Sequence, residues 1–508
     1  MKTIFIFLSF IILCGNISAQ YQIEPNKKGN SYYLNPIFAG DYPDPSLLRD
    51  GKDYYIVHSS FEYYPGLLIW HSTDLINWTP VANALHRYIG SVWAPDMVKH
   101  NGKYYIYIPA DNKNYVVWAE SIKGPWSEPI DLKADVGIDP GHVVDADGKR
   151  YLYFSNGGYV PLSDDGLSVT GEIKHSYDGW PIPREWSIEC FCLESPKFVK
   201  RGEYYYLIAA QGGTAGPATG HMIVAARSKS PLGPWENSPY NPIIRANSHF
   251  ERWCSRGHGT LFDDHKGDWW MMYHGYEKNF YTMGRQTLLE PIEWTADGWF
   301  KVPDRVATDQ PIKRPSLPAS HTSFSLNDDF SGNTLKPHWT FFGGYDEGRI
   351  RLENKSLVMK TKGDGVGSSS PMLCVPSHHS YTVDVEINLQ GNATAGLVLF
   401  YNNVYYSGIL ADSKNILTNL RGWQFPTEQN VHENRVFLRL KSIHNQVDMY
   451  YSLDGKNWMK TENSADVSSM HHNVLSGFMG LRIGLSSFGE GTVTFKNFRY
   501  TPVEAELK

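Results

Sequence analysis

The sequence predicts an all-β protein in which a five-bladed β-propeller is followed by a β-sandwich of the jelly-roll type. Three observations lead to this prediction. The chain has 508 residues, which is too many for one ordinary core. A phrase of glycine and aromatic residues recurs five times between residues 51 and 273. Alternating apolar stretches, typical of strands, resume after a proline-rich segment.

Residues 1–19 form the first predicted segment. They contain Lys2, the apolar run IFIFLSFIILC and the small-residue ending Ile-Ser-Ala. This pattern is typical of a secretory signal peptide, because the apolar run is too short to span a membrane. No later stretch approaches about 18 apolar residues, so we expect an exported protein, periplasmic or secreted, with no membrane span.

Composition restricts the partners. The formal net charge is −6 and there is no lysine or arginine tract, which argues against nucleic acid as a partner. The chain has 16 tryptophans and 32 tyrosines, which suit a large β core or a surface that stacks on sugar rings. Cys190 and Cys192, separated by one residue, are expected to lie too close together for easy mutual bonding.

The propeller prediction, for residues 30–312, depends on the spacing of the repeated phrase. Its glycines lie 51, 46, 54 and 65 positions apart, at Gly51, Gly102, Gly148, Gly202 and Gly267. Each phrase indicates a hairpin turn followed by a strand. Three units also carry a later tryptophan phrase, at residues 72–78, 121–126 and 228–235, which indicates an outer hairpin. Five units of about fifty residues are typical of five propeller blades.

A polar residue precedes each repeated glycine by six to nine positions. These residues are Asp44, Asp96, Asp139, Glu194 and His258. The first strand of each blade lines the central channel, so the five side chains should converge at its mouth. Taken singly each would be an ordinary turn or structural residue, but the shared register favours an active site.

Three carboxylates and a histidine in an aromatic setting suit glycosidic bond cleavage. That reaction needs one group to protonate the leaving oxygen and a second to activate water or attack the sugar. A non-catalytic sugar-binding propeller is the alternative, but it would have no need for three acidic residues at the blade starts.

Seven segments, in order, resemble the signatures of family 43 glycoside hydrolases over about residues 34 to 310. They are YPDPS at Asp44, Trp93-Ala94-Pro95, IDPG at Asp139, LESPKF at Glu194, Gly212-Gly213-Thr214, Gly257-His258-Gly259 and Gly284-Arg285-Gln286-Thr287. The stretch SSFEYYPGLLIWHSTDLINW resembles the branch with β-xylosidases and α-L-arabinofuranosidases. The resemblance implies an inverting enzyme that removes terminal pentoses from plant cell-wall oligosaccharides.

The resemblance also implies a role for each site residue. Asp44 would be the general base, Glu194 the general acid, and Asp139 would orient Glu194 and raise its pKa. Phe61, Trp93 and Arg285 would contact the sugar. His258 resembles a channel histidine that contacts water or an ion, often calcium, although the chemistry requires no cofactor.

Glu189, in IECF, leaves one alternative open. It resembles the Glu-Cys phrase of five-bladed fructosidases, which retain configuration through an aspartate nucleophile. Glu194 is preferred because it shares the register of the other blades, whereas Glu189 lies thirteen positions before Gly202.

Asp41 and Asp44 have similar surroundings in the sequence. Pro45 is expected to bias Asp44 toward an extended backbone, and Pro43 to fix the approach of the chain. Asp41 is then expected to be a turn or rim residue.

The segment from Ala307 contains three prolines and predicts a linker at 313–322, with the sandwich at 323–503. The sandwich resembles the concanavalin-like domains that accompany family 43 enzymes. It could bind carbohydrate independently or push a loop over the active site. Segments near Tyr405 and Trp423 are the candidates for such a loop.

Overall fold

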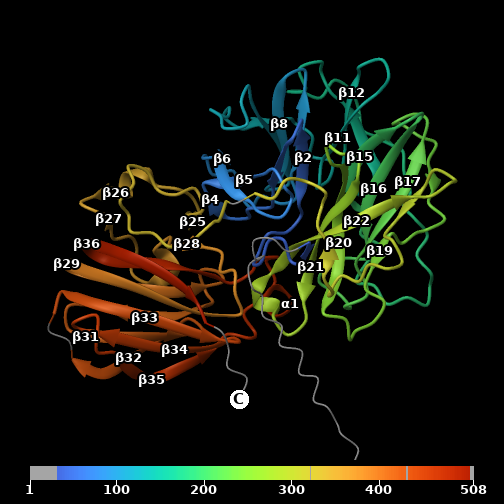
Figure 1. Cartoon of the computed structure of the whole chain (residues 1–508). Coiled ribbons are helices and arrows are strands. Elements are labelled where there is room, and N and C mark those ends of the chain that lie inside the picture. The colour runs from blue at the N-terminus through green and yellow to red at the C-terminus, as the bar shows by residue number, and fades with distance from the viewer. Residues whose placement is uncertain (1–30, 321, 431–432, 504–508) are drawn as a thin grey trace, which may run out of the picture.

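The computed structural model describes residues 31–320, 322–430 and 433–503, and the predicted signal peptide lies outside them. Figure 1 shows two β-rich domains side by side, the propeller in blue to green and the sandwich in orange to red. The fold class is the one predicted. Among the described residues, no helix has the length and apolar character needed to cross a membrane.

The propeller consists of five antiparallel sheets that follow one another along the chain. Their strands are β2 (Ser46–Asp50), β3 (Asp53–Val57), β5 (Gly66–Ser72) and β6 (Thr79–Leu85); β7 (Asp96–His100), β8 (Lys103–Ala110), β9 (Lys113–Ala119) and β10 (Ile130–Asp131); β11 (Gly141–Val144), β12 (Arg150–Tyr153), β13 (Gly158–Pro161) and β14 (Lys174–His175); β15 (Glu194–Arg201), β16 (Tyr204–Gln211), β17 (Met222–Ser228), β18 (Glu236–Asn237) and β19 (Ile244–Arg245); β20 (Trp253–Asp263), β21 (Trp269–Glu277), β22 (Arg285–Trp294) and β23 (Phe300–Lys301). Two short 3-10 helices, η1 (Ser155–Gly157) and η2 (Tyr281–Met283), lie between strands.

The repeated glycines occupy the turns between the first and second strands of the blades. All five have φ between 60° and 90°, the left-handed region that favours glycine. The three tryptophan phrases connect the third strand to the fourth in the first, second and fourth blades. Both kinds of hairpin are therefore as predicted.

The ends of the propeller are joined by a small sheet and by a shared core. Strand β1 (Tyr32–Tyr33) pairs with β24 (Ile312–Lys313), which brings both ends of the domain together. One buried cluster contains Tyr54 and Trp70 of the first blade with Trp270 and Leu289 of the fifth. Lys313, the first residue of the predicted linker, is thus still part of a propeller strand.

The sandwich is built around two long strands, β29 (Ser380–Phe400) and β36 (Arg482–Pro502), which pair along most of their length. The first half of β29 also pairs with β33 (Arg435–Ile443), and its second half with β30 (Tyr406–Ala411). The remaining elements are β25 (Thr340–Phe342), η3 (Glu347–Arg349), β26 (Ile350–Glu353), β27 (Ser356–Lys360), η4 (Val366–Ser368), β28 (Met372–Cys374), β30 (Tyr406–Ala411), β31 (Asn415–Leu420), β32 (Trp423–Asn430), β33 (Arg435–Ile443), β34 (Gln446–Ser452), β35 (Met459–Asp466) and α1 (His472–Leu475).

The two domains are joined by a strand pair and a common core. Strand β4 (Tyr63–Tyr64) of the propeller pairs with β25 of the sandwich. Phe61 and Tyr63 belong to the same buried cluster as the sandwich core. Leu481 donates its backbone N–H to the Thr282 carbonyl across the interface at 2.8 Å. The sandwich therefore packs directly against the propeller.

Candidate active site

The blade starts bring three carboxyl groups around one imidazole. His258 Nδ1 lies 3.3 Å from Asp44 Oδ1, and its Nε2 lies 3.0 Å from Glu194 Oε1 and 3.7 Å from Asp139 Oδ2. Asp44 and Asp139 each lie two positions before the first strand of their blade, Glu194 begins β15, and His258 lies within β20. Four of the five blade-start residues singled out from the sequence thus meet in one place.

Asp96, the fifth blade-start residue, has a structural environment. Its carboxylate forms a buried ion pair with Lys197 at 2.8 Å and accepts the backbone N–H of His142 at 2.7 Å. Lys197 comes from the fourth blade, that of Glu194, whereas Asp96 begins the second, so this pair links two non-adjacent blades. The spacing before the repeated glycine therefore predicts that a residue lies in the channel, but it does not predict whether that residue is catalytic or structural.

Asp44 is buried and held by cations. Arg285 Nη1 donates to its Oδ1 at 2.8 Å, and Ser59 donates its hydroxyl to Oδ2. Burial alone would raise the pKa of Asp44, but Arg285 and His258 together hold that pKa well below the usual value. Asp44 is consequently an ionised carboxylate throughout the neutral and weakly acidic range.

The backbone at Asp44 corrects one prediction. Asp44 has φ of +57°, so the expectation that Pro45 would keep it extended is wrong. Its N–H donates to His274 Nδ1 at 3.1 Å, which together with the Arg285 contact outweighs the local preference. Asp139 and His258 have similar φ values of +57° and +51°. Left-handed non-glycine residues of this kind cluster at functional sites.

His274 supports Asp44 as a neutral imidazole. It is completely buried, and burial lowers its pKa to about 3. Its Nδ1 accepts the Asp44 N–H at 3.1 Å and lies equally far from Asp44 Oδ1, and its Nε2 faces Thr214 Oγ1 at 3.4 Å.

Asp139 and His258 retain protons more strongly than usual. Burial, followed by the Glu194 and Asp44 carboxylates, raises the pKa of Asp139 to about 7, although His258 opposes this. Burial lowers the pKa of His258, but the carboxylates outweigh it and raise that pKa to about 9. Three carboxylates facing Arg285 and a protonated His258 leave one net negative charge, which a single additional proton neutralises.

The predicted sugar-contacting residues surround this cluster. The Arg285 guanidinium lies 5.9 Å from the centre of the Phe61 ring and 5.7 Å from that of Phe478. The Trp93 and Phe478 rings lie 5.8 Å apart. Arg285 Nε and Asp139 Oδ2 are buried without a hydrogen-bond partner in the described part of the chain. Buried polar atoms of this kind suit a hydroxylated ligand.

Phe478 is a site residue that sequence reasoning missed. It belongs to the sandwich, in the segment 476–480. Its N–H donates to His472 Nδ1 at 2.8 Å, its ring stacks on His472, and its carbonyl accepts from Arg285 Nη2 at 3.4 Å. The sequence signal was the phrase SGFMG, an aromatic residue between glycines. Tyr405 and Trp423, the predicted candidates, are 37% and 75% exposed.

Asp41 lies at a bend of the chain, as predicted, but it is buried and not on the rim, and it fixes the segment that carries Phe478. It is only 3% exposed, and its carboxylate accepts the N–H of Gly480 at 2.8 Å and that of Arg285 at 3.4 Å. A Cβ at Gly480 would lie 2.7 Å from the Cβ of Asp41, so this close approach requires glycine. Sequence reasoning failed because the contact joins two domains.

Glu189 and the neighbouring cysteines lie beside the acidic cluster. The Glu189 carboxylate accepts the N–H of Ala215 at 2.8 Å, whereas Glu194 contacts His258. Cys190 and Cys192 form a disulfide, which corrects the expectation that they are too close to bond easily. Cys192 has φ of +39°, and this turn places the two Cα atoms 5.3 Å apart, within the usual disulfide range.

The resemblance implies a calcium ion near His258, so the ligand atoms that the channel offers there can be compared with those that calcium prefers. Two groups have ligand atoms within 4.8 Å of one another: Asp44 with His258 and His274, and Glu194 with His221 and His258. Each group therefore offers two imidazole nitrogens and one carboxylate. Calcium prefers six to eight oxygen ligands, so these residues do not fit calcium.

Comparisons with known proteins agree with this geometry. The model of glycosyl hydrolases family 43 matches residues 33–300, and that of the beta xylosidase C-terminal concanavalin A-like domain matches residues 327–501. A non-reducing end alpha-L-arabinofuranosidase from Bacteroides ovatus is 28% identical, over 90% of this chain and 92% of the relative. A xylan 1,3-beta-xylosidase from a Vibrio species is 29% identical, over 84% and 89%.

The fold also matches a solved structure of a family 43 protein. The family 43 protein BlXynB from Bacillus licheniformis superimposes with a TM-score of 0.85 at 28% identity, covering 93% of this chain and all of that one. The first family model spans more than half of the chain, and both domains are matched in order. The chain therefore belongs to family 43 of the glycosyl hydrolases and is a glycoside hydrolase.

Proposed function

We propose that this enzyme removes a terminal pentose, xylose or arabinofuranose, from plant cell-wall oligosaccharides with inversion at the anomeric carbon. The observation that carries the proposal is the cluster of Asp44, Asp139 and Glu194 around His258, with Phe478 of the sandwich beside it. Family 43 enzymes invert configuration and need no cofactor for catalysis. The relatives named above act on arabinofuranosides and xylosides.

The carboxyl groups divide the chemistry between them. Ionised Asp44 takes a proton from water as the water oxygen attacks the anomeric carbon. Glu194 gives its proton to the glycosidic oxygen as the carbon–oxygen bond breaks. Asp139 faces the same nitrogen of His258 as Glu194 does, so it is the residue that orients the acid.

The pH dependence follows from these charges. We expect kcat/KM on an oligosaccharide to stay level through weakly acidic pH and to fall as pH rises past about 7, because Asp139, which lies beside the acid, then loses its proton. Protonation of Asp44 does not lower kcat/KM in this pH range, because the pKa of Asp44 lies well below the usual value. Asp139→Asn should move the descending limb to lower pH, because no second carboxyl remains to hold the proton.

A pH–rate profile of both proteins measures this effect. Asp263→Asn, on an exposed ion pair with Arg49, is the matched control and should leave the profile unchanged. A descending limb at the same pH in Asp139→Asn and in the unchanged enzyme would remove Asp139 from the proton balance.

Phe478 is proposed to close the sugar site against Trp93 and to favour terminal residues. Phe478→Ala should raise KM for short xylo- or arabino-oligosaccharides about tenfold, because the ring no longer covers the bound sugar. Phe425→Ala, an exposed phenylalanine on β32, should leave KM unchanged. Steady-state kinetics on a disaccharide measures both. An unchanged KM in Phe478→Ala would instead favour a sandwich that binds carbohydrate independently.

The identity of the sugar is tested by product release. The 4-nitrophenyl β-xylopyranoside and α-L-arabinofuranoside, followed by the corresponding oligosaccharides, distinguish the two pentoses. Release of neither pentose would contradict the proposed substrate class.

We further propose that residues 1–19 direct export and are removed, because their pattern is typical of a signal peptide. The mass of the protein recovered outside the cytoplasm tests this, since an intact N-terminus would contradict it.

We assign no calcium at His258, for the reason given by the donor atoms. Metal analysis of the purified protein tests that assignment, and stoichiometric calcium would overturn it.

A further inference from the structure

A disulfide lies immediately upstream of the proposed acid. We propose that the Cys190–Cys192 disulfide positions Glu194 for proton donation, so that its reduction selectively slows cleavage of substrates with poor leaving groups. This inference rests on the proposed function and adds a positioning device to it. The device consists of the segment 189–193 and its contacts with the segment 212–216.

The backbone of Glu194 depends on the chain that precedes it. On the downstream side, Glu194 pairs with Ala210, but the register then shifts before Lys197, and Ser195 has φ of +55°. The sheet therefore holds Glu194 on one side of an irregularity. On the upstream side, only Leu193 separates Glu194 from the disulfide, and its carbonyl accepts the Asn156 N–H at 2.8 Å.

The disulfide stabilises an unfavourable turn in this upstream segment. Cys192 has φ of +39°, a left-handed conformation that non-glycine residues rarely adopt. The covalent link to Cys190 closes a ring with Phe191 as its middle residue. Breaking the link would allow Cys192 to relax toward an ordinary φ, and the resulting shift would reach Glu194 through a single residue.

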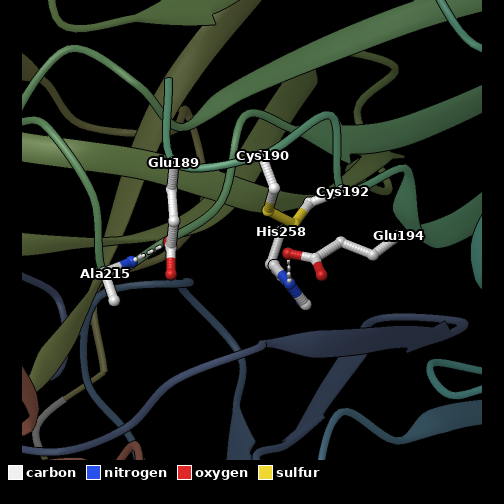
Figure 2. The surroundings of a disulfide bond; sticks show 6 residues. All are labelled: Glu189, Cys190, Cys192, Glu194, Ala215 and His258. Atoms are coloured by element: carbon white, nitrogen blue, oxygen red, sulfur yellow. Dashed lines mark hydrogen bonds and ion pairs between the residues drawn. A yellow bond between two sulfur atoms is a disulfide. The ribbon is translucent and has the colours of Figure 1, made fainter. Parts of the chain in front are cut away.

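The other side of the ring is anchored to the segment 212–216. Glu189 donates its N–H to the Gly212 carbonyl at 3.0 Å, and Gly212 donates its own to the Phe191 carbonyl at 3.1 Å. Figure 2 shows the Glu189 side chain reaching the Ala215 N–H, while Glu194 beyond the disulfide reaches His258. A Cβ at Gly213 would lie 3.1 Å from Cys190 Sγ, so the segment packs closely on the disulfide.

The anchoring segment also reaches the base. Thr214 lies within it, and its Oγ1 is 3.4 Å from Nε2 of His274, whose Nδ1 accepts the Asp44 N–H at 3.1 Å. The disulfide ring is thus connected to the acid through Leu193 and, through Thr214 and His274, to the base. Rigid support of this kind is what a catalytic pair requires to keep its geometry.

The redox step is a simple exchange. A dithiol reductant supplies two electrons and two protons, the S–S bond breaks, Cys190 and Cys192 become thiols, and the reductant becomes its own disulfide. Both cysteines are partly exposed, so a small dithiol can reach them. Cys254 and Cys374 are buried free cysteines that this exchange leaves unchanged.

The experiment compares the oxidised enzyme, the enzyme reduced with dithiothreitol and the double variant Cys190→Ser with Cys192→Ser. Each is assayed on a disaccharide, which needs the acid, and on a 4-nitrophenyl glycoside, which needs it little. We expect reduction to lower kcat on the disaccharide at least tenfold and kcat on the activated glycoside less than twofold. Reoxidation should restore the rate, and mass spectrometry after thiol alkylation confirms the redox state.

Two controls isolate the disulfide. The double variant should behave like the reduced enzyme and should no longer respond to dithiothreitol, whereas Cys254→Ser should respond as the unchanged enzyme does. The descending limb of the pH–rate profile should also move on reduction, which a purely structural disulfide would not cause.

Three outcomes would overturn the inference. The first is that reduction leaves kcat unchanged on each of the two substrates. The second is that reduction lowers kcat equally on both substrates and also lowers the Tm. The third is that the double variant still responds to dithiothreitol. An oxidised enzyme that hydrolyses neither glycoside would contradict the proposed function itself, and the positioning role would fall with it.

Discussion

Glu194→Gln is expected to lower kcat on a disaccharide by about 1,000-fold, within the range that general acid catalysis supplies. The amide keeps the size of the side chain and its position beside His258 but has no proton to give the leaving oxygen. Activated 4-nitrophenyl glycosides leave without that proton, so their kcat should fall by less than about tenfold. Steady-state kinetics on the two substrates measures the difference.

Glu203→Gln is the matched control, because Glu203 lies on the same blade in an exposed ion pair with Lys229. It should leave both rates unchanged. An equal loss on both substrates in Glu194→Gln would remove Glu194 from the role of acid. If Glu189→Gln produced the leaving-group-dependent loss instead, the assignment would move to Glu189.

Asp44→Asn is expected to lower kcat by about 1,000-fold or more on disaccharide and aryl glycoside alike. Every substrate needs an activated water, and an amide cannot accept its proton. The pattern therefore differs from that of Glu194→Gln, because the loss is independent of the leaving group. Kinetics on the same two substrates measures it.

Asp263→Asn serves again as the control for Asp44→Asn, as a propeller aspartate remote from the cluster of His258. It should retain full activity. A loss in Asp44→Asn that disappeared on activated glycosides would contradict the role of Asp44 as base. Thermal unfolding of each variant shows whether removing the buried charge beside Arg285 has also altered the fold.

The fold was predictable because its signals are local. A glycine at a hairpin turn, such as Gly51, has the left-handed φ that the turn requires, and the aromatic residues after it form the next strand. The same register located Asp44, Asp139, Glu194 and His258 in one channel. It could not separate Asp96 from them, because that assignment depends on Lys197, about a hundred positions away in the sequence.

The remaining features depend on long-range contacts. Asp41 binds Gly480, which is 439 positions later, so neither residue alone indicates that the sandwich completes the site. Asp44 departs from the preference that Pro45 imposes because His274 and Arg285, on the fifth blade, hold it. The same reason explains why Phe478 was missed, since its importance arises from contacts with Trp93 and Arg285.

In the proposed mechanism Asp44 activates water directly against the sugar while Glu194 protonates the leaving oxygen. Proton NMR of the first-formed pentose, recorded before mutarotation, tests this mechanism. From a β-xyloside we predict α-xylose as the first product, the inverted anomer. Initial release of β-xylose would show that configuration is retained and would contradict the assignment of Asp44 as the base.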